Sequence, residues 1–316
     1  MKIVILNSLL ILALLIQSCD KVKNPYPKQY VDIDTTLIFG MNLENYKNTL
    51  WPTFSNNTNT NVNVLIEDFT GHQCVNCPNA ALAAEAIESA NPDRVFIASI
   101  HSGANGTTYF QDFEYAPFTT NFTNAEGLTI SKEITDGGFS GNPSGTNNRK
   151  NFGGFKFQNF GSWSSNVSSI LTANDLKVNL QSKLNYFPQT RGVLLHTEIE
   201  LKQSVANDLY QVVYVIEDTL VSPQSVPANW NIPGNIDYNY VHRDIMRGCI
   251  DGKALGQKLI PAMKVDKNGK PTQGEKYYIN YSYKIPNIYD EKNLHFLIYV
   301  YDGLSKEILQ VIKQDI

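Results

Sequence analysis

The residues of this sequence best suited to chemistry are Cys74 and Cys77, followed directly by Pro78. An apolar run over residues 62–69 leads through a polar turn to the first cysteine, and an alanine-rich stretch over residues 79–87 follows the proline. This pattern predicts a strand, a turn and a helix whose first turn holds both thiols. The positive end of a helix dipole favours a thiolate, and proline fits a first helical turn because its missing N–H costs nothing there. Two cysteines at this spacing can close a small disulfide, so the sequence predicts a thiol–disulfide centre.

Two interpretations of this centre stay open. In an active centre Cys74 is the nucleophile, nearer the exposed helix tip, and Cys77 is the resolving thiol; the alternative is a structural disulfide. We expect His72 to be exposed in its turn and His101 to be hydrogen-bonded at a strand end. A zinc site that also used His72 and Cys249 would join distant segments. We therefore expect no metal and no cofactor, and a buried, inert thiol at Cys249.

The N-terminus predicts export and a lipid anchor. The apolar run from Ile3 to Ile16 is typical of a signal peptide, because a bilayer-spanning helix needs roughly 20 residues. It is followed by Ser18-Cys19, which resembles the lipobox of bacterial lipoproteins, where the cysteine is lipidated and begins the mature chain. We expect residues 1–19 to be this signal peptide, Cys19 to be the lipidation site, and the membrane to be a partner through the anchor. Disulfides persist in such envelope compartments.

The remaining chain has a two-domain length. Residues 20–61 are polar, with several prolines and an Asn/Thr run, and predict a tether. We expect a first domain with strands and helices over residues 62–175, including a helix over residues 163–173. From residue 176 the sequence pattern changes to runs of alternating apolar and polar residues separated by turns. This pattern predicts an antiparallel β-sandwich of immunoglobulin-like type over residues 176–316. The net charge of −4 is not clustered, so we expect no nucleic-acid partner.

Two stretches resemble a known family. Residues 67–78, EDFTGHQCVNCP, and residues 240–248, YVHRDIMRG, are similar to motifs of the outer membrane protein 28-related lipoproteins of Gram-negative bacteria. The resemblance implies a fold of class α/β plus all-β, in which a thioredoxin-like domain precedes a β domain. It also implies an outer membrane lipoprotein on the periplasmic or the surface face.

A wider similarity to thioredoxins implies roles for two further residues. Asp68 lies six residues before the first cysteine, where thioredoxins carry a buried aspartate that assists proton transfer at the second cysteine, here Cys77. Pro143, which follows a glycine-rich stretch, matches their cis-proline, so we expect a cis Asn142–Pro143 bond beside the disulfide. Gln73 stands in place of their tryptophan, and the long stretch before Pro143 implies an insertion over the site.

These observations favour two functions. One is a membrane-tethered oxidoreductase that exchanges thiols and disulfides through Cys74 and Cys77. The other is a surface or periplasmic lipoprotein that binds partners without catalysis and uses the same fold as a scaffold. Other envelope proteins are the partners expected for either function.

Overall fold

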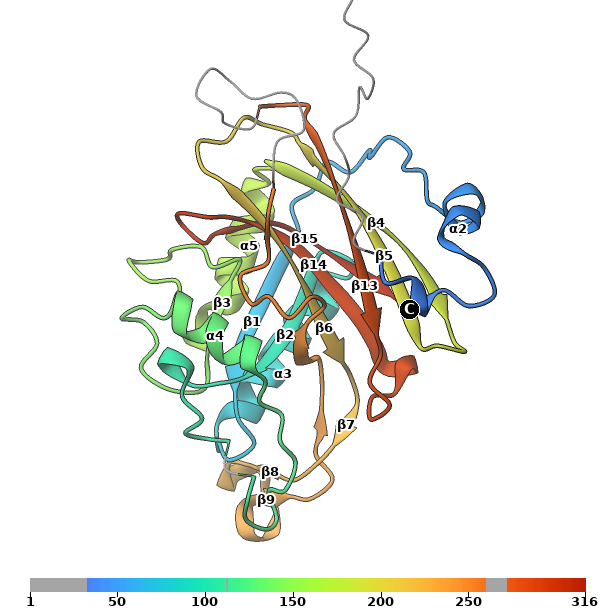
Figure 1. The fold of residues 1–316 in the computed structure, drawn as a ribbon. Coiled ribbons are helices and arrows are strands. Elements are labelled where there is room, and N and C mark those ends of the chain that lie inside the picture. Colours follow the sequence, from blue (N-terminus) through green and yellow to red (C-terminus); the bar gives the residue numbers. More distant parts are fainter. Residues whose placement is uncertain (1–32, 112, 260–271) are drawn as a thin grey trace, which may run out of the picture. The chain divides into compact units, whose positions relative to one another are not determined.

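A mixed sheet connects the two halves of the chain (Figure 1). The computed structural model describes residues 33–111, 113–259 and 272–316. Among these residues the largest sheet has eight strands, in the order β15-β14-β6-β11-β2-β1-β3, with β12 paired to β6. The strands of this sheet are β1 (Val64–Thr70), β2 (Val95–His101), β3 (Ser144–Asn147), β6 (Leu209–Glu217), β11 (Ile245–Cys249), β12 (Gln257–Lys258), β14 (Leu294–Asp302) and β15 (Ile308–Asp315).

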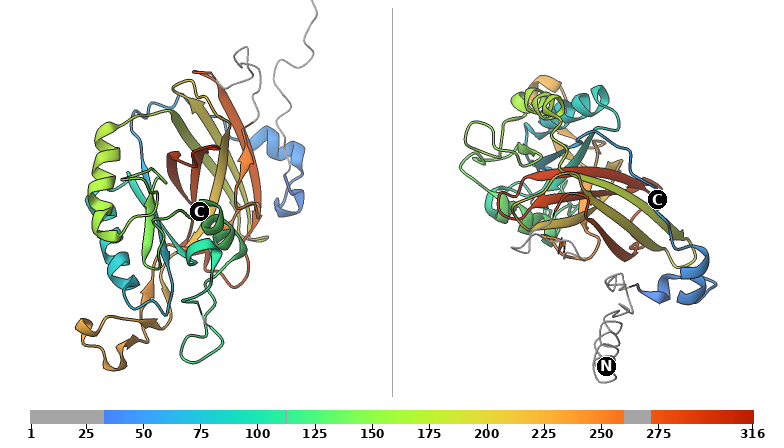
Figure 2. Two further views of the ribbon diagram at one scale, coloured as in Figure 1. Left: turned by 90° about the vertical axis from the view of Figure 1, so that its left-hand side faces the viewer. Right: turned by 90° about the horizontal axis from the view of Figure 1, so that it is seen from above.

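The first half contains the predicted strand–turn–helix unit. Strands β1 and β2 are parallel and are joined through α3 (Cys77–Ala90), while β3 pairs antiparallel with the other edge of β1. Helices α3 and α5 (Trp163–Ala173) cover one face of this part of the sheet, as the left view of Figure 2 shows. Helix α5 confirms the helix predicted from the spacing of apolar residues.

Alternation along β1 decides which side chains face the helices. Val64 and Ile66 pack in the core beneath α3 and α5, whereas Leu65 and Phe69 belong to the core on the opposite face, which α4 (Ala125–Ile134) also enters. Because successive strand residues point to opposite faces, Asp68 lies on the α3 face. Its neighbour Glu67 points the other way.

The second half is built mainly of antiparallel strands. A three-stranded sheet has the order β13-β5-β4, and its strands are β4 (Val178–Phe187), β5 (Gly192–Leu201) and β13 (Lys276–Lys284). Apolar side chains of β5 and β13 pack against those of β6 and β14 in one buried cluster. The chain is therefore a mixed α/β structure followed by a mainly β structure, as the sequence predicted at this level.

The large sheet runs across the boundary that we predicted between residues 175 and 176. Strand β11 pairs in parallel with β2 through Ile245 and Ser99, and the Ser99 N–H donates to the carbonyl oxygen of Asp244 at 2.8 Å. Strands from both predicted domains thus share one hydrogen-bonded sheet. The sequence gives no sign of this pairing, because it joins backbone groups about 146 residues apart. The boundary itself stays a prediction.

A buried ion pair fastens the same sheet. Arg149, just after β3, binds the two carboxylate oxygens of Glu67 at 2.6 and 2.8 Å. The hydroxyl of Tyr214 on β6 donates to Glu67 at 2.8 Å, and Tyr299 on β14 donates to Tyr214 at 2.9 Å. Burial alone would raise the pKa of Glu67, but Arg149 and the hydroxyl donors hold it below its ordinary value. This cluster ties strands of both halves together.

Part of the segment expected to be a tether packs on the protein. Residues 33–61 contain η1 (Thr35–Leu37) and α2 (Leu43–Thr49). Tyr46 of α2 is fully buried beside Phe187 and Leu194, and its hydroxyl lies 2.6 Å from Nε2 of His196. This packing differs from the free tether that we expected, because a few apolar residues in the polar segment are enough to anchor it. The predicted signal peptide and Cys19 lie outside the described residues.

Short elements complete the described chain. No helix in the described ranges is both long and apolar enough to cross a bilayer. Between β6 and β11 the chain makes an excursion over residues 220–242, which we name the capping segment (Figure 1, orange). Its elements are β7 (Leu220–Val221), β8 (Gln224–Ser225), η4 (Ala228–Trp230), η5 (Pro233–Asn235), β9 (Ile236–Asp237) and β10 (Val241–His242). The other short elements are η2 (Ala104–Gly106), η3 (Phe160–Ser162) and η6 (Glu291–Asn293).

Candidate functional site

Cys74 and Cys77 form a disulfide where β1 turns into α3. Their Cα atoms are 5.4 Å apart. The turn is held by two successive backbone bonds, from Cys74 N to the Gly71 oxygen and from Cys77 N to the Cys74 oxygen. Helix α3 begins at Cys77, and Pro78 occupies its first turn. The structure therefore places Cys77 at the helix N-terminus and Cys74 in the turn before it, rather than both thiols in the first helical turn as we predicted.

Asp68 lies behind the disulfide on β1. Its side chain is buried on the α3 face, and its Oδ1 atom has no hydrogen-bond partner among the described residues. Burial without a compensating charge raises the pKa of Asp68 to about 7. Asp68 and Cys77 line the same small cavity, of about 30 Å³. The structure thus brings together two of the residues singled out in the sequence.

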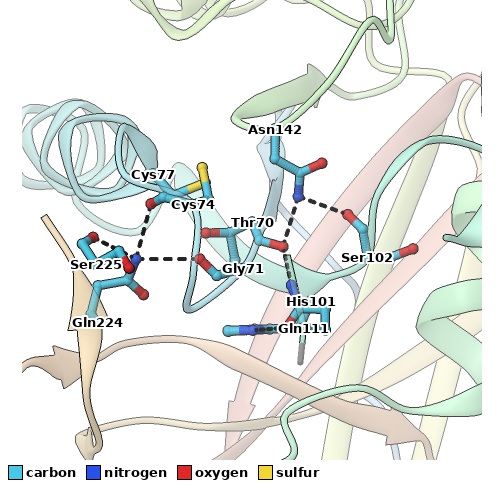
Figure 3. The surroundings of a disulfide bond; sticks show 10 residues. All are labelled: Thr70, Gly71, Cys74, Cys77, His101, Ser102, Gln111, Asn142, Gln224 and Ser225. Carbon is cyan, nitrogen blue, oxygen red and sulfur yellow. Dashed lines mark hydrogen bonds between the residues drawn. A yellow bond between two sulfur atoms is a disulfide. The ribbon is translucent and has the colours of Figure 1, made fainter. Parts of the chain in front are cut away.

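The Asn142–Pro143 peptide bond is cis, as predicted. The side-chain amide of Asn142 donates to the carbonyl oxygens of Thr70, at 2.8 Å, and Ser102, at 3.1 Å, and so joins the ends of β1 and β2 (Figure 3). Thr70 is the last residue of β1 before the disulfide turn. A role of Pro143 in the chemistry of the site stays a prediction.

Our expectation that Cys74 is exposed is wrong. Both cysteines are only 2% exposed, whereas Val75 between them is 47% exposed. The Nε2 atom of Gln224 in the capping segment donates to the carbonyl oxygens of Gly71, at 3.2 Å, and Cys74, at 3.1 Å (Figure 3). The N–H of Ser225 adds a bond of 2.8 Å to the His72 oxygen. Residues from the second half of the chain therefore cover the disulfide turn.

A second cover comes from the insertion predicted between Cys77 and Pro143. The Gln73 N–H donates to the carbonyl oxygen of Phe110 at 3.2 Å. The side chain of Gln111 donates to the Thr70 oxygen at 2.7 Å, and its Oε1 atom lies 2.9 Å from Nδ1 of His101. Two glutamine amides, one from each cover, thus bind backbone oxygens of the same turn.

Histidines near the site are buried rather than exposed. His101 is hydrogen-bonded at a strand end, as expected, but His72 is buried against Phe118 with ring centroids 5.1 Å apart, which corrects our expectation of an exposed side chain. His242 of the capping segment packs on Phe122 at 4.7 Å. Burial lowers the pKa of His101 and lowers that of His242 to about 4. Both rings are therefore neutral at pH 7.

Some residues of the site carry no usable signal in the sequence. Gln224 and Gln111 lie in segments without a clear periodicity, and only folding places their amides against the disulfide turn. Tyr240, His242 and Asp244 line the cavity that Asp68 and Cys77 share. These three residues belong to the motif at residues 240–248, which the sequence did not connect with this site.

Comparison with known proteins identifies the family. Residues 130–316, more than half of the chain, match the sequence profile of the family described as outer membrane protein Omp28. The chain belongs to the Omp28 family. Membership confirms the resemblance seen in the sequence motifs and places the protein at the outer membrane of the cell envelope.

The chain also matches solved structures at low sequence identity. HBP35 of Porphyromonas gingivalis matches with a TM-score of 0.56 at 14% identity, over 81% of this chain and 76% of that one, which shows a shared fold. A protein of Agrobacterium tumefaciens matches with a TM-score of 0.47 at 13% identity, over 81% and 95% of the two chains. A domain of the outer membrane lipoprotein Omp28 of Porphyromonas gingivalis matches with a TM-score of 0.28 at 15% identity, over 45% and 89%. The sequence matches no curated protein.

Proposed function

We propose that this Omp28-family protein is a lipid-anchored thiol–disulfide exchange protein with a thioredoxin-like centre at Cys74 and Cys77. The observation that carries the proposal is the unpartnered, buried carboxyl oxygen of Asp68, which shares a cavity with Cys77. A carboxyl group with a pKa of about 7 can give or take a proton at neutral pH. A purely structural disulfide would gain nothing from such a costly group beside it.

The exchange step uses the two cysteines in different roles. A thiolate of a reduced dithiol partner attacks Sγ of Cys74, the bond between the two cysteine sulfurs breaks, and Cys77 leaves as a thiolate that takes the proton of Asp68. The second thiol of the partner then loses its proton and attacks the mixed disulfide, which releases Cys74 as a thiolate that takes up a proton in turn. The protein ends as a dithiol and the partner as a disulfide.

The architecture supports the finer parts of this proposal. The parallel β1–α3–β2 unit, the antiparallel β3 and the cis bond before β3 suit a thioredoxin-like unit over residues 62–175. The three-stranded antiparallel sheet, packed on the antiparallel strands β6 and β14 of the large sheet, suits an immunoglobulin-like sandwich over residues 176–316. Other envelope proteins are the proposed exchange partners.

The alternative function is a binding lipoprotein whose thioredoxin-like fold is a scaffold. The observation that favours it is the covering of both cysteines by two segments of the chain itself. In this case the disulfide would fasten the turn, and the exposed surface would carry the function.

Trapping separates the two functions. The variant Cys77→Ser leaves Cys74 as a thiol that cannot be resolved, so native protein incubated with oxidised glutathione should form a stable mixed disulfide at Cys74. The matched variant Cys74→Ser should form much less, because the proposal makes Cys77 the resolving thiol, which does not react with the partner. If Cys74 forms the adduct only after denaturation, the scaffold function is favoured.

We also propose that Cys19 carries the lipid anchor, because Ser18-Cys19 closely follows a short apolar run. Cells labelled with palmitate should yield labelled protein, and Cys19→Ala should abolish the label. Cys249→Ala serves as the control and should keep it. Label that persists in the Cys19→Ala protein would contradict the anchor.

A further inference from the structure

The cavity behind the disulfide is lined both by Cys77 and by residues of the Tyr240–Asp244 stretch. Its walls include Asp68 and Cys77 at one part, Ser99 on β2, and Tyr240 and Asp244 from the second half. Its volume of about 30 Å³ is enough for one or two water molecules. Buried polar groups without protein partners are commonly satisfied by such waters.

Asp68 has no direct contact with solvent through which it could exchange a proton. It is 1% exposed, and its Oδ1 atom lacks a partner among the described residues. The side chain of Asp244, in contrast, is 17% exposed and lies in the wall of the same cavity. Of these two carboxyls in the wall of one cavity, Asp244 is therefore the one in contact with solvent.

We propose that water in this cavity links Asp68 to Asp244, and that Asp244 is the positioning group through which the Asp68 proton exchanges with solvent during disulfide reduction. This inference rests on the proposed function. When Cys77 leaves as a thiolate it takes the proton of Asp68, Asp68 takes one from the water, and Asp244 replaces that proton and regains its own from solvent. The electrons come from the reducing dithiol, so the relay moves protons only.

The charges around Asp244 agree with this role. Burial raises the pKa of Asp244 to about 8, close to the value of about 7 for Asp68, so both carboxyls can exchange protons near neutral pH. His101 and His242 in the same wall stay neutral, because burial lowers the pKa of each. The charged or titratable groups that face Asp244 are Glu88, Asp218, Lys313, Arg243 and His295, the last with its Nε2 atom 3.9 Å from Asp244.

The mouth of the cavity is lined by opposite charges. Arg243 lies 3.8 Å from Glu85 and 3.4 Å from Asp218, and both Arg243 and Glu85 line the cavity. Asp218 bears on Arg243 and Asp244 electrostatically but does not line the cavity. Asp93→Asn is the control, since Asp93 is exposed, does not line the cavity and is not among the groups that act on Asp244.

The test is the rate at which dithiothreitol reduces the disulfide of the full mature chain between pH 5.5 and 9.5. Each rate is divided by the concentration of the dithiothreitol thiolate at that pH. Asp244→Asn should slow reduction about tenfold at pH 7. In the wild type the relay predicts that the rate falls above pH 8, where Asp244 loses its proton, and Asp244→Asn should abolish this fall. Asp244→Glu should restore most of the rate, and Asp93→Asn should stay within about twofold of the wild type. An unchanged rate and pH profile in Asp244→Asn, or equal slowing in Asp93→Asn, would overturn the relay.

Two further measurements separate the possible failures. If Asp68→Asn slows reduction and Asp244→Asn does not, the relay fails and the proposed function stands. If neither does, the proposed function loses its support as well. Should Asp244→Asn not fold, the wild-type rate in D₂O decides, because equal rates in H₂O and D₂O would contradict a proton relay.

Discussion

At the scale of single residues, the most unusual feature of the site is that the buried carboxyl group of Asp68 has an oxygen without a hydrogen-bond partner among the described residues. A buried carboxyl without a partner must stay protonated or cost free energy when it ionises. The sequence predicted Asp68 at this position through its distance from the first cysteine. It did not predict the missing partner, because that depends on which side chains surround the cavity after folding.

The burial of Asp68 predicts that the stability of the protein depends on pH. The rise in the pKa of Asp68 from an ordinary 3.8 to about 7 means that the folded state binds more protons than the unfolded state between these values. Stability should therefore fall as pH rises from about 4 to about 7, by roughly 4 kcal/mol at most, since one pKa unit corresponds to about 1.4 kcal/mol. Asp68→Asn should remove this part of the loss.

Urea denaturation of the oxidised protein at several pH values checks this expectation. The difference in unfolding free energy between Asp68→Asn and wild type should grow in favour of the variant from pH 4 to pH 8. The exposed residue Asp93 provides the control, because Asp93→Asn should give a difference that does not change with pH. If the difference in unfolding free energy for Asp68→Asn stays constant with pH, the burial of Asp68 does not destabilise its charged form.

At the scale of elements, the disulfide turn is held between two covering segments. Gln224 and Ser225 bind it from the capping segment, and Phe110 and Gln111 bind it from the insertion before Pro143. The sequence predicted the insertion, since the spacing between the cysteines and the proline is long. It did not predict the capping segment, because this stretch follows the site by about 150 residues and its Gln224 side chain and Ser225 N–H bind only backbone oxygens of the turn.

The cover predicts how fast small reductants reach the disulfide. Gln224→Ala removes the amide that binds the Gly71 and Cys74 oxygens, so the capping segment should open more often. Removing a buried hydrogen-bonding side chain costs about 1–3 kcal/mol, so reduction by dithiothreitol should become roughly tenfold faster. The reaction is followed by alkylation of the released thiols and mass spectrometry.

A surface glutamine supplies the matched control for this experiment. Gln203 binds Asp175 far along the chain from the disulfide turn, and Gln203→Ala should leave the rate of reduction unchanged. A slower or unchanged rate in Gln224→Ala, with the fold intact, would mean that the capping segment does not control access.

At the scale of the whole molecule, one sheet and one buried ion pair hold the halves of the chain together. The sequence predicted the local units well: the strand–turn–helix at the cysteines and the helix at residues 163–173 have strong periodic patterns. It could not predict that β11 joins β2, since this register follows from backbone pairing. Nor could it predict the packing of residues 33–61, where the composition suggested only a tether.

The ion pair between Arg149 and Glu67 predicts a strong effect on stability. Arg149→Met removes the positive charge and leaves Glu67 buried beside Tyr214 without its cation. Breaking a buried pair from one side typically costs about 3–5 kcal/mol, and chemical denaturation should show a loss of this size. Lys177→Met, which breaks an exposed pair with Asp175, should cost less than about 1 kcal/mol. Equal losses in the two variants would contradict a fastening role for the cluster.

The reduction potential of the Cys74–Cys77 pair tests the central claim most directly. The full mature chain is equilibrated with mixtures of reduced and oxidised dithiothreitol, and the fraction of dithiol is read by alkylation and mass spectrometry. Structural disulfides typically have potentials below about −300 mV, whereas exchange centres lie higher. Thiol–disulfide exchange predicts a potential above about −300 mV. It also predicts that the pH dependence of the potential differs between Asp68→Asn and wild type. A potential well below about −300 mV, equal in both proteins, would contradict the claim and identify the pair as a structural disulfide.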